Sequence, residues 1–232
     1  MKALVTGASR GIGRAIAEAL IAEGMEVVVC ASSDAPEVRG AALSRRCDVA
    51  DEASVRALFA ASGRCDCVVL NAGVLERGPI EGFTAAQWDR VLGVNLRGAF
   101  LCAREAFRSG ATRIVAVGSI SGTLGTPHAA AYNASKWGLT GLTKSWAIEL
   151  APHDIRVVSI HPTGVDTPLN DGLAMLEGKT TEEIAEQSAG NLQPVPWIEA
   201  QDVADAVVFL VSDKARYMTG TELVIDAGLL TK

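Results

Sequence analysis

The sequence predicts a doubly wound α/β domain with a seven-stranded, mostly parallel sheet and helices on both faces. Strand-like and helix-like segments alternate from one end of the chain to the other, which is typical of βα units. The strand-like segments are continuously apolar, and this indicates a sheet covered on both faces. The 232 residues suffice for one well-buried domain, and neither an internal repeat nor a low-complexity linker divides them. We therefore predict a single domain over residues 1–232.

The expected elements follow this alternation in order. Strands are expected at 3–5, 26–30, 45–48, 67–70, 114–117, 156–160 and 223–225. Helices are expected at 11–23, 52–61, 84–107, 130–150 and 202–211. Thr84 and Gln87 have the spacing of a capping box, which places the start of the third helix. The stretch 31–44 is short, so a helix between the second and third strands is expected to be reduced or lost.

Composition and charge narrow the classes of partner. The net charge is −6, the pI is near 5.2 and the basic residues are scattered, which argues against nucleic acid or an anionic membrane as a partner. No apolar run is long enough to span a bilayer. The chain runs from Met1 directly into a glycine motif without the apolar region of a signal peptide, so we expect a cytoplasmic protein.

The five cysteines are odd in number, and most lie in apolar surroundings. Cys65 and Cys67 suggest a metal site, but no second cysteine pair or nearby histidine completes a tetrahedral ligand set. We predict buried thiols and no metal.

A glycine-rich turn follows the first strand, in the stretch Thr6-Gly7-Ala8-Ser9-Arg10-Gly11-Ile12-Gly13. Its glycines remove side chains where a sharp turn, a phosphate and helix–sheet packing need space. The helix that starts near Gly11 would present free N–H groups to the phosphates. The motif predicts a Rossmann-type dinucleotide site, although taken alone it also fits an ordinary glycine-rich turn.

Tyr132 and Lys136 lie four residues apart on an expected helix and therefore share one face. A phenol with a pKa near ~10 exchanges protons poorly at neutral pH, and a nearby ammonium lowers that pKa. Ser119 stands just beyond a strand, where its hydroxyl can hydrogen-bond a substrate oxygen. Taken alone, the pair also fits a solvated helix face. Asn71-Ala72-Gly73 follows another strand, at the sheet edge where open α/β sheets bind ligands.

Together these motifs resemble the short-chain dehydrogenase/reductase family over essentially the whole chain. The resemblance places an adenine-pocket pair at Asp48 and Val49 and an active-site asparagine at Asn95. It extends to the closing segment 219–228, where Ala227 replaces a glycine. The stretch 118–125 resembles the 3-oxoacyl carrier-protein reductase subgroup.

The resemblance implies an enzyme that interconverts a ketone and a secondary alcohol. Tyr132 would be the general acid/base, and Lys136 would bind the nicotinamide ribose and lower the Tyr132 pKa. Ser119 would hold the carbonyl oxygen, and Asn95 would hold a water of a proton relay. The residues assigned to the cofactor are Gly7, Ser9, Arg10, Gly11, Ile12, Gly13, Ser32, Ser33, Asp48, Val49, Asn71, Ala72, Gly73, Tyr132, Lys136, Pro162, Gly164, Val165 and Thr167.

The end of the second strand bears on the choice between NAD and NADP. Ala31 stands where NAD-preferring members of the family have an aspartate, which would bind the ribose 2′-hydroxyl. Ser32, Ser33 and Arg10 can donate to a 2′-phosphate. NADP(H) is therefore favoured over NAD(H), unless Asp34 reaches the ribose.

The substrate is the least determined part of the prediction. The expected wall residues are mostly apolar and favour a hydrophobic ketone or alcohol: Ser121, Leu124, His128, Thr163, Leu169, Met175 and Trp197. His128 and His161 could orient a polar group, but a solvated loop and strand-end packing are the favoured interpretations of these two histidines. His161-Pro162-Thr163-Gly164 departs from the usual Asn-Pro-Gly of the family. The irregular stretch 167–197 is predicted to be a substrate-binding loop or lid, with a surface insertion as the alternative.

Two alternative functions remain open. One is a 3-oxoacyl carrier-protein reductase, although the turn 151–154 lacks the arginine or lysine expected to dock an acidic carrier. The other is a non-catalytic cofactor-binding sensor or scaffold, because fold does not imply function. Family members usually assemble through the two long helices, so a homotetramer or homodimer is expected.

Overall fold

The computed structural model describes residues 1–168, 178–180, 183 and 191–231. Within them, one parallel sheet has the strand order β3-β2-β1-β4-β5-β6-β7. The strands are β1 (Lys2–Thr6), β2 (Glu26–Ala31), β3 (Leu43–Arg46), β4 (Cys67–Leu70), β5 (Arg113–Val117), β6 (Arg156–Pro162) and β7 (Glu222–Ile225). The chain starts in the middle of the sheet, reaches one edge at β3 and returns to fill the other side. The strand order therefore reverses between β1 and β4, and the predicted doubly wound sheet is confirmed.

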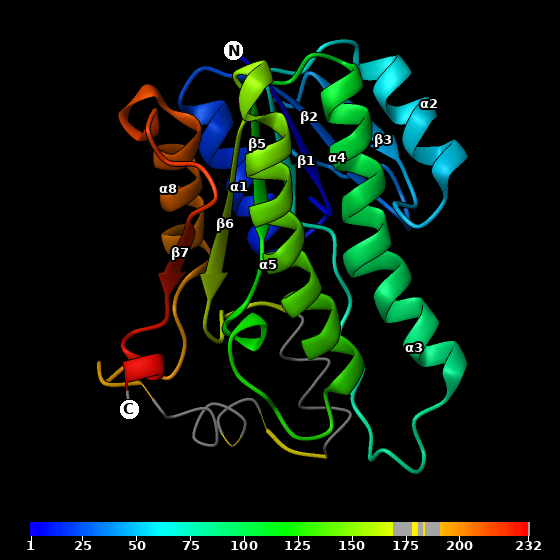
Figure 1. Cartoon of the computed structure of the whole chain (residues 1–232), viewed down its shortest axis with the longest axis vertical. Helices are drawn as coiled ribbons and strands as arrows, with labels where there is room; N and C mark the ends of the chain where they lie inside the picture. The colour runs from blue at the N-terminus through cyan, green and yellow to red at the C-terminus, as the bar shows by residue number, and fades with distance from the viewer. Residues whose placement is uncertain (169–177, 181–182, 184–190, 232) are drawn as a thin grey trace.

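Two helical layers cover the sheet (Figure 1). The helices α1 (Gly11–Ala22) and α8 (Ala200–Val211) pack together on one face. The helices α2 (Glu52–Ser62), α4 (Ala99–Arg108) and α5 (Ala130–Leu150) cover the other. Successive residues of β1 point to opposite faces of the sheet. Leu4 belongs to the core beneath α2, α4 and α5, and Val5 belongs to the core beneath α1 and α8. This burial on both faces accounts for the continuously apolar strands.

The predicted helix 84–107 is divided in the structure. It begins with α3 (Ala85–Leu92), whose Thr84–Gln87 capping box is present as expected. A π-helical segment, Gly93–Gly98, then leads into α4. The π turn contains the buried Asn95, and such turns occur often at functional sites.

The third strand lies two residues earlier than the predicted range 45–48. Its ladder with β2 pairs Val28 with Leu43 and ends at the pair Ala31–Arg46. Asp48 lies beyond the strand, where its Oδ1 accepts a hydrogen bond of 2.9 Å from the Ala50 amide in the turn toward α2. The stretch 32–42 contains no helix, as expected.

The described residues also bear on the metal and membrane predictions. All five cysteines are buried free thiols, and the described part of the chain holds no group of three or more His, Cys, Asp or Glu suited to a metal ion. No described helix is long and apolar enough to cross a bilayer.

Candidate active site

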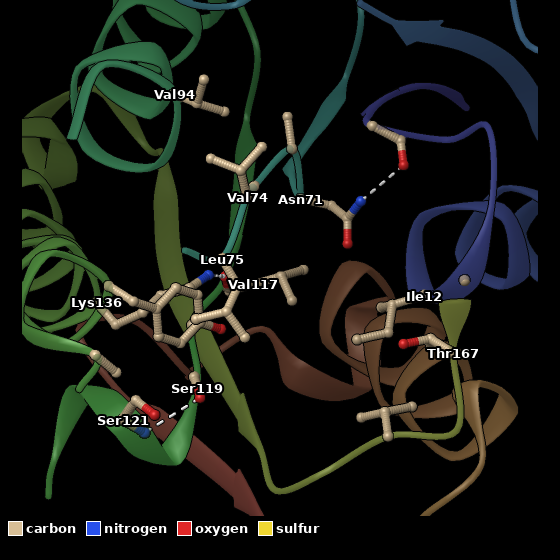
Figure 2. Close-up of a pocket in the computed structure, with 18 of the residues that line it drawn as sticks. Ile12, Asn71, Val74, Leu75, Val94, Val117, Ser119, Ser121, Lys136 and Thr167 are labelled. Carbon is tan, nitrogen blue, oxygen red and sulfur yellow. Dashed lines mark hydrogen bonds between the residues drawn. The ribbon is translucent and has the colours of Figure 1, made fainter. Parts of the chain in front are cut away.

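A large cleft of about 1920 Å³ opens at the carboxyl ends of the strands. It lies where the strand order reverses, which is the usual ligand site of an open parallel sheet. Every residue that the sequence assigned to the cofactor lines this cleft. Figure 2 shows Ser119, Ser121 and Lys136 on one side of it and Ile12 and Thr167 on the other.

The glycine turn is connected to the end of β4 by the side chains of Thr6 and Asn71. Asn71 Nδ2 donates to the carbonyls of Thr6 at 2.9 Å and Gly7 at 3.1 Å. In return, Thr6 Oγ1 accepts from the amides of Asn71 at 3.0 Å and Ala72 at 3.1 Å. Thr6 is almost fully buried, so these bonds fix the turn from beneath.

The turn leaves no room for side chains at two glycines. A Cβ on Gly7 would lie 2.8 Å from the Ala72 Cα, and a Cβ on Gly13 would lie 2.3 Å from Asn71 Nδ2. Gly7 also has a φ of +68°, which disfavours any L side chain. The N-cap residue of α1, Arg10, makes no side-chain cap, and the first turn of the helix holds no acidic residue. A close-approaching backbone and a helix N-terminus without a carboxylate fit a dinucleotide pyrophosphate.

The other end of the cleft contains the predicted catalytic residues. Ser119 follows β5, and its Oγ accepts from the Ser121 amide at 3.1 Å and hydrogen-bonds the Tyr132 side chain. Tyr132 and Lys136 come from the first turns of α5. Lys136 Nζ lies 5.6 Å from the centre of the Tyr132 ring and donates to the Val117 carbonyl at 2.8 Å. The helix and the end of β5 therefore bring these three residues together.

Burial changes the proton affinity of both side chains. It lowers the pKa of Lys136 to about 8, because the ammonium loses its hydration. It raises the pKa of Tyr132, and the hydrogen bond from Ser119 and the charge of Arg77 counteract this only in part. The sequence predicted that Lys136 lowers the Tyr132 pKa. In this structure the groups that lower the Tyr132 pKa are Ser119 and Arg77, and burial outweighs them.

Asn95 lies beside the cleft rather than in its lining. Its amide makes two bonds to Val74, accepting from the backbone N–H at 2.8 Å and donating to the carbonyl at 2.9 Å. Its Nδ2 also donates to Ser135 Oγ at 3.1 Å, and that hydroxyl donates to the Tyr132 carbonyl at 2.7 Å. Asn95 thus connects the segment after β4 to the first turns of α5.

The predicted substrate residues divide into three groups. Ser121, Leu124, His128 and Thr163 line the cleft. Trp197 does not, and its ring packs behind Gly164, where an added Cβ would lie 3.7 Å from it. Leu169 and Met175 lie outside the described residues, as does most of the predicted lid 167–197.

Sequence reasoning missed Arg77 and did not identify the hydrogen bonds of His161. Arg77 lines the cleft, and its charge acts on the Tyr132 hydroxyl. The sequence signal for it was its position four residues after Gly73, in the loop that leaves β4. His161 was considered as a packing residue, but both of its ring nitrogens are hydrogen-bonded, one of them to the backbone of Ser119.

Comparison with known proteins identifies the class. A family model described as enoyl-(acyl carrier protein) reductase matches residues 7–230. The trans-4-hydroxycyclohexanecarboxylate dehydrogenase of Sinomonas cyclohexanicum is 34% identical, over 97% of this chain and 91% of that protein. The 3-alpha-(or 20-beta)-hydroxysteroid dehydrogenase of Mycobacterium tuberculosis is 37% identical, over 97% and 88%. The solved aldohexose dehydrogenase of Thermoplasma acidophilum superposes with a TM-score of 0.91 and 35% identity, over 100% of this chain and 94% of that one.

The chain therefore belongs to the short-chain dehydrogenase/reductase family. The dehydrogenases among its relatives support an oxidoreductase that uses NAD(P) and acts on a small molecule.

Proposed function

We propose that the protein interconverts a ketone and a secondary alcohol with NAD(P)(H), and that Tyr132 is the general acid/base. The observation that carries this proposal is the grouping of Ser119, Tyr132 and Lys136 in the same cleft as the glycine turn. The bound nicotinamide supplies or accepts the hydride. In the reducing direction, the Tyr132 hydroxyl gives its proton to the substrate oxygen, which the Ser119 hydroxyl holds by a hydrogen bond.

Lys136 and Asn95 support this proton transfer in different ways. The buried Lys136 ammonium, oriented by the Val117 carbonyl, is placed to bind the nicotinamide ribose. Asn95 keeps the π turn against α5 through Val74 and Ser135. We propose that a water held at this turn returns the proton from solvent through Lys136.

NADP(H) is the proposed cofactor. Ala31 ends β2 without a carboxylate, and Ser32, Ser33 and Arg10 line the cleft while Asp34 does not. Arg46 Nε donates to the Ser32 carbonyl at 2.9 Å, which adds a cation beside this loop. Fluorescence titration with NADPH and NADH is the direct test, with an Ala31→Asp variant expected to shift the preference toward NADH. Tighter NADH binding by the unchanged protein would contradict the assignment.

The substrate proposal is a hydrophobic ketone or secondary alcohol on an alicyclic skeleton. Leu124 and the apolar residues Val74, Leu75 and Val94 are part of the cleft lining. Two relatives are named for hydroxycyclohexanecarboxylate and hydroxysteroid substrates. Of the predicted lid 167–197, the described residues Thr167, Pro168 and Lys179 line the cleft.

The decisive experiment compares Tyr132→Phe with Tyr217→Phe, because these are the two tyrosines of the chain and Tyr217 is 88% exposed. Each variant is assayed with cyclohexanol, 4-hydroxycyclohexanecarboxylate and a 3-hydroxysteroid. Tyr132→Phe should abolish turnover and keep cofactor binding, whereas Tyr217→Phe should behave as the unchanged enzyme. Turnover by Tyr132→Phe would refute the mechanism. Cofactor binding without turnover by the unchanged enzyme would favour the non-catalytic sensor or scaffold.

The carrier-protein alternative gains no support from the turn that the sequence comparison singled out. The turn after α5, Ala151–His153, carries no lysine or arginine, and His153 packs edge-on against Phe107 at 5.1 Å.

A homotetramer or homodimer is the proposed assembly. Large apolar side chains are exposed on the helices expected to pair, among them Trp88 on α3, Phe100 on α4 and Trp137 on α5. Surface of this kind indicates an interface. Light scattering should give a multiple of 24.2 kDa, and a monomer at micromolar concentration would contradict the proposal.

A further inference from the structure

His161 lies fully buried near the end of β6, directly behind Ser119. Its Nδ1 is 3.0 Å from the Ser119 carbonyl oxygen, and its Nε2 is 2.8 Å from Ser159 Oγ. A carbonyl only accepts hydrogen bonds, so the proton belongs on Nδ1 and Nε2 accepts from the Ser159 hydroxyl. Burial lowers the His161 pKa, which favours this neutral tautomer.

The imidazole ring also occupies the space beside the residue that precedes Ser119. A Cβ on Gly118 would lie 2.8 Å from the ring Cε1 and 2.9 Å from Nδ1. Gly118 donates its N–H to the Ile160 carbonyl at 2.7 Å, so the β5–β6 ladder continues one residue beyond the strand. The ring thus packs against the backbone that leads into the candidate active site.

The Ser119 peptide is held from two sides. Its carbonyl accepts from Nδ1 of His161 and from the Gly122 amide at 2.8 Å. Its hydroxyl accepts from the Ser121 amide and hydrogen-bonds Tyr132. His161 fixes the carbonyl group of Ser119. The direction in which the Ser119 hydroxyl points therefore depends on that imidazole.

We propose that His161 is a positioning residue for Ser119. This inference rests on the proposed function, because Ser119 matters only if it holds the substrate oxygen beside Tyr132. His161 touches neither substrate nor cofactor, since it is not part of the cleft lining. It acts by keeping the Ser119 peptide in the orientation that catalysis needs.

The charged groups around the ring define when this support is lost. Glu222 Oε2 lies 4.0 Å from Nε2 and its Oε1 is 2.7 Å from Lys144 Nζ. Glu222 favours an imidazolium, whereas Lys136 and Lys144 oppose it. A proton on Nε2 would end its acceptance from Ser159 and would favour an ion pair with Glu222, which lies 4.0 Å away. Because burial holds the His161 pKa below its usual value, this occurs only at acidic pH.

Two substitutions of similar polarity test the role of Nδ1. His161→Asn places an amide N–H near the position of Nδ1, so it can still donate to the Ser119 carbonyl. His161→Gln extends its amide toward Ser159 and leaves that carbonyl without the bond. With the panel substrate that turns over fastest, we expect His161→Gln to lower kcat by up to about 100-fold. His161→Asn should recover most of this loss, and the Kd of the cofactor should be unchanged in both.

A double-mutant cycle with Ser119→Ala tests whether His161 acts through Ser119. If it does, adding His161→Gln to the Ser119→Ala variant should lower kcat little further. In the His161→Gln single variant, the midpoint of the rate of alcohol oxidation against pH should also move to higher pH. The reason is that Tyr132 loses the hydrogen bond from Ser119, which lowers its pKa.

Additive losses in kcat, or equal losses in the Asn and Gln variants, would overturn the positioning role. Turnover by Tyr132→Phe would instead overturn the proposed function itself, so the two failures are distinguishable.

Discussion

The burial of Lys136 lowers the free energy of unfolding at neutral pH, and the size of this effect depends on pH. Its side chain is 5% exposed and its pKa falls from 10.5 to about 8. This change corresponds to about 3 kcal/mol of disfavoured charge in the folded protein at neutral pH. Lys136→Met removes that charge and also the hydrogen bond to the Val117 carbonyl, whose loss costs about 1–2 kcal/mol. The variant should therefore be more stable than the unchanged protein by about 1–2 kcal/mol at pH 7, and it should be inactive.

The sign of the pH dependence follows from proton binding. Between pH 8 and 10.5 the unfolded state retains the Lys136 proton while the folded state releases it. The unchanged protein therefore gains stability by about 1.4 kcal/mol per pH unit in this window, and the variant does not. From pH 7 to pH 9.5, the stability difference should shift by about 2 kcal/mol in favour of the unchanged protein.

Urea unfolding at matched protein concentration measures this difference at the two pH values. Lys214→Met serves as the control, because Lys214 is exposed in the turn after α8, and its effect on stability should be the same at both. A difference for Lys136→Met that does not change with pH would refute the assignment of a desolvated ammonium. Activity retained by the variant would contradict the proposed ribose contact.

Three further predictions concern the cleft. Arg77→Met removes a charge that lowers the Tyr132 pKa, so the midpoint of kcat/KM for alcohol oxidation against pH should move to higher pH; an unchanged midpoint would contradict the contact. Gly13→Ala places a Cβ 2.3 Å from Asn71 Nδ2, so the cofactor Kd measured by calorimetry should rise at least tenfold, the equivalent of about 1.4 kcal/mol; unchanged affinity would show that the turn tolerates the methyl group. Thr6→Val leaves two backbone amides without their acceptor and should lower the free energy of unfolding in urea by about 2–3 kcal/mol.

The sequence determines most of the sheet because each buried strand is a short apolar run. The third strand was misplaced for a physical reason: it is an edge strand with exposed Arg45 and Arg46, so its apolar pattern is weak. Pairing with β2, rather than local sequence, sets its position. The π segment around Asn95 was missed for a similar reason, since its residues fit a regular helix and the bonds that accompany the wider turn come from the distant Val74.

That the predicted cofactor residues line one cleft was predictable, because most of their motifs follow strands and parallel strands end at one edge of the sheet. The contacts among the catalytic residues were less predictable. The Tyr–Lys spacing places both side chains on one face of α5, but burial determines their pKa values and burial depends on the whole fold. Arg77 lies in a loop without a periodic pattern, and its position shortly after Gly73 does not indicate that its charge reaches Tyr132.

A common principle connects three polar side chains around the cleft, of which Asn95 and His161 are buried. Asn71 joins the end of β4 to the turn after β1, Asn95 joins the segment after β4 to α5, and His161 joins β6 to the segment after β5. Each makes long-range bonds at the carboxyl edge of the sheet, and each holds the backbone of another segment. A cleft held in this way needs little reorganisation when a substrate oxygen meets Ser119 and Tyr132, which is the condition under which fixed dipoles contribute most to catalysis. Substitutions at these three positions should therefore reduce turnover through the geometry of the backbone that they fix, even though His161 and Asn95 lie outside the lining of the cleft.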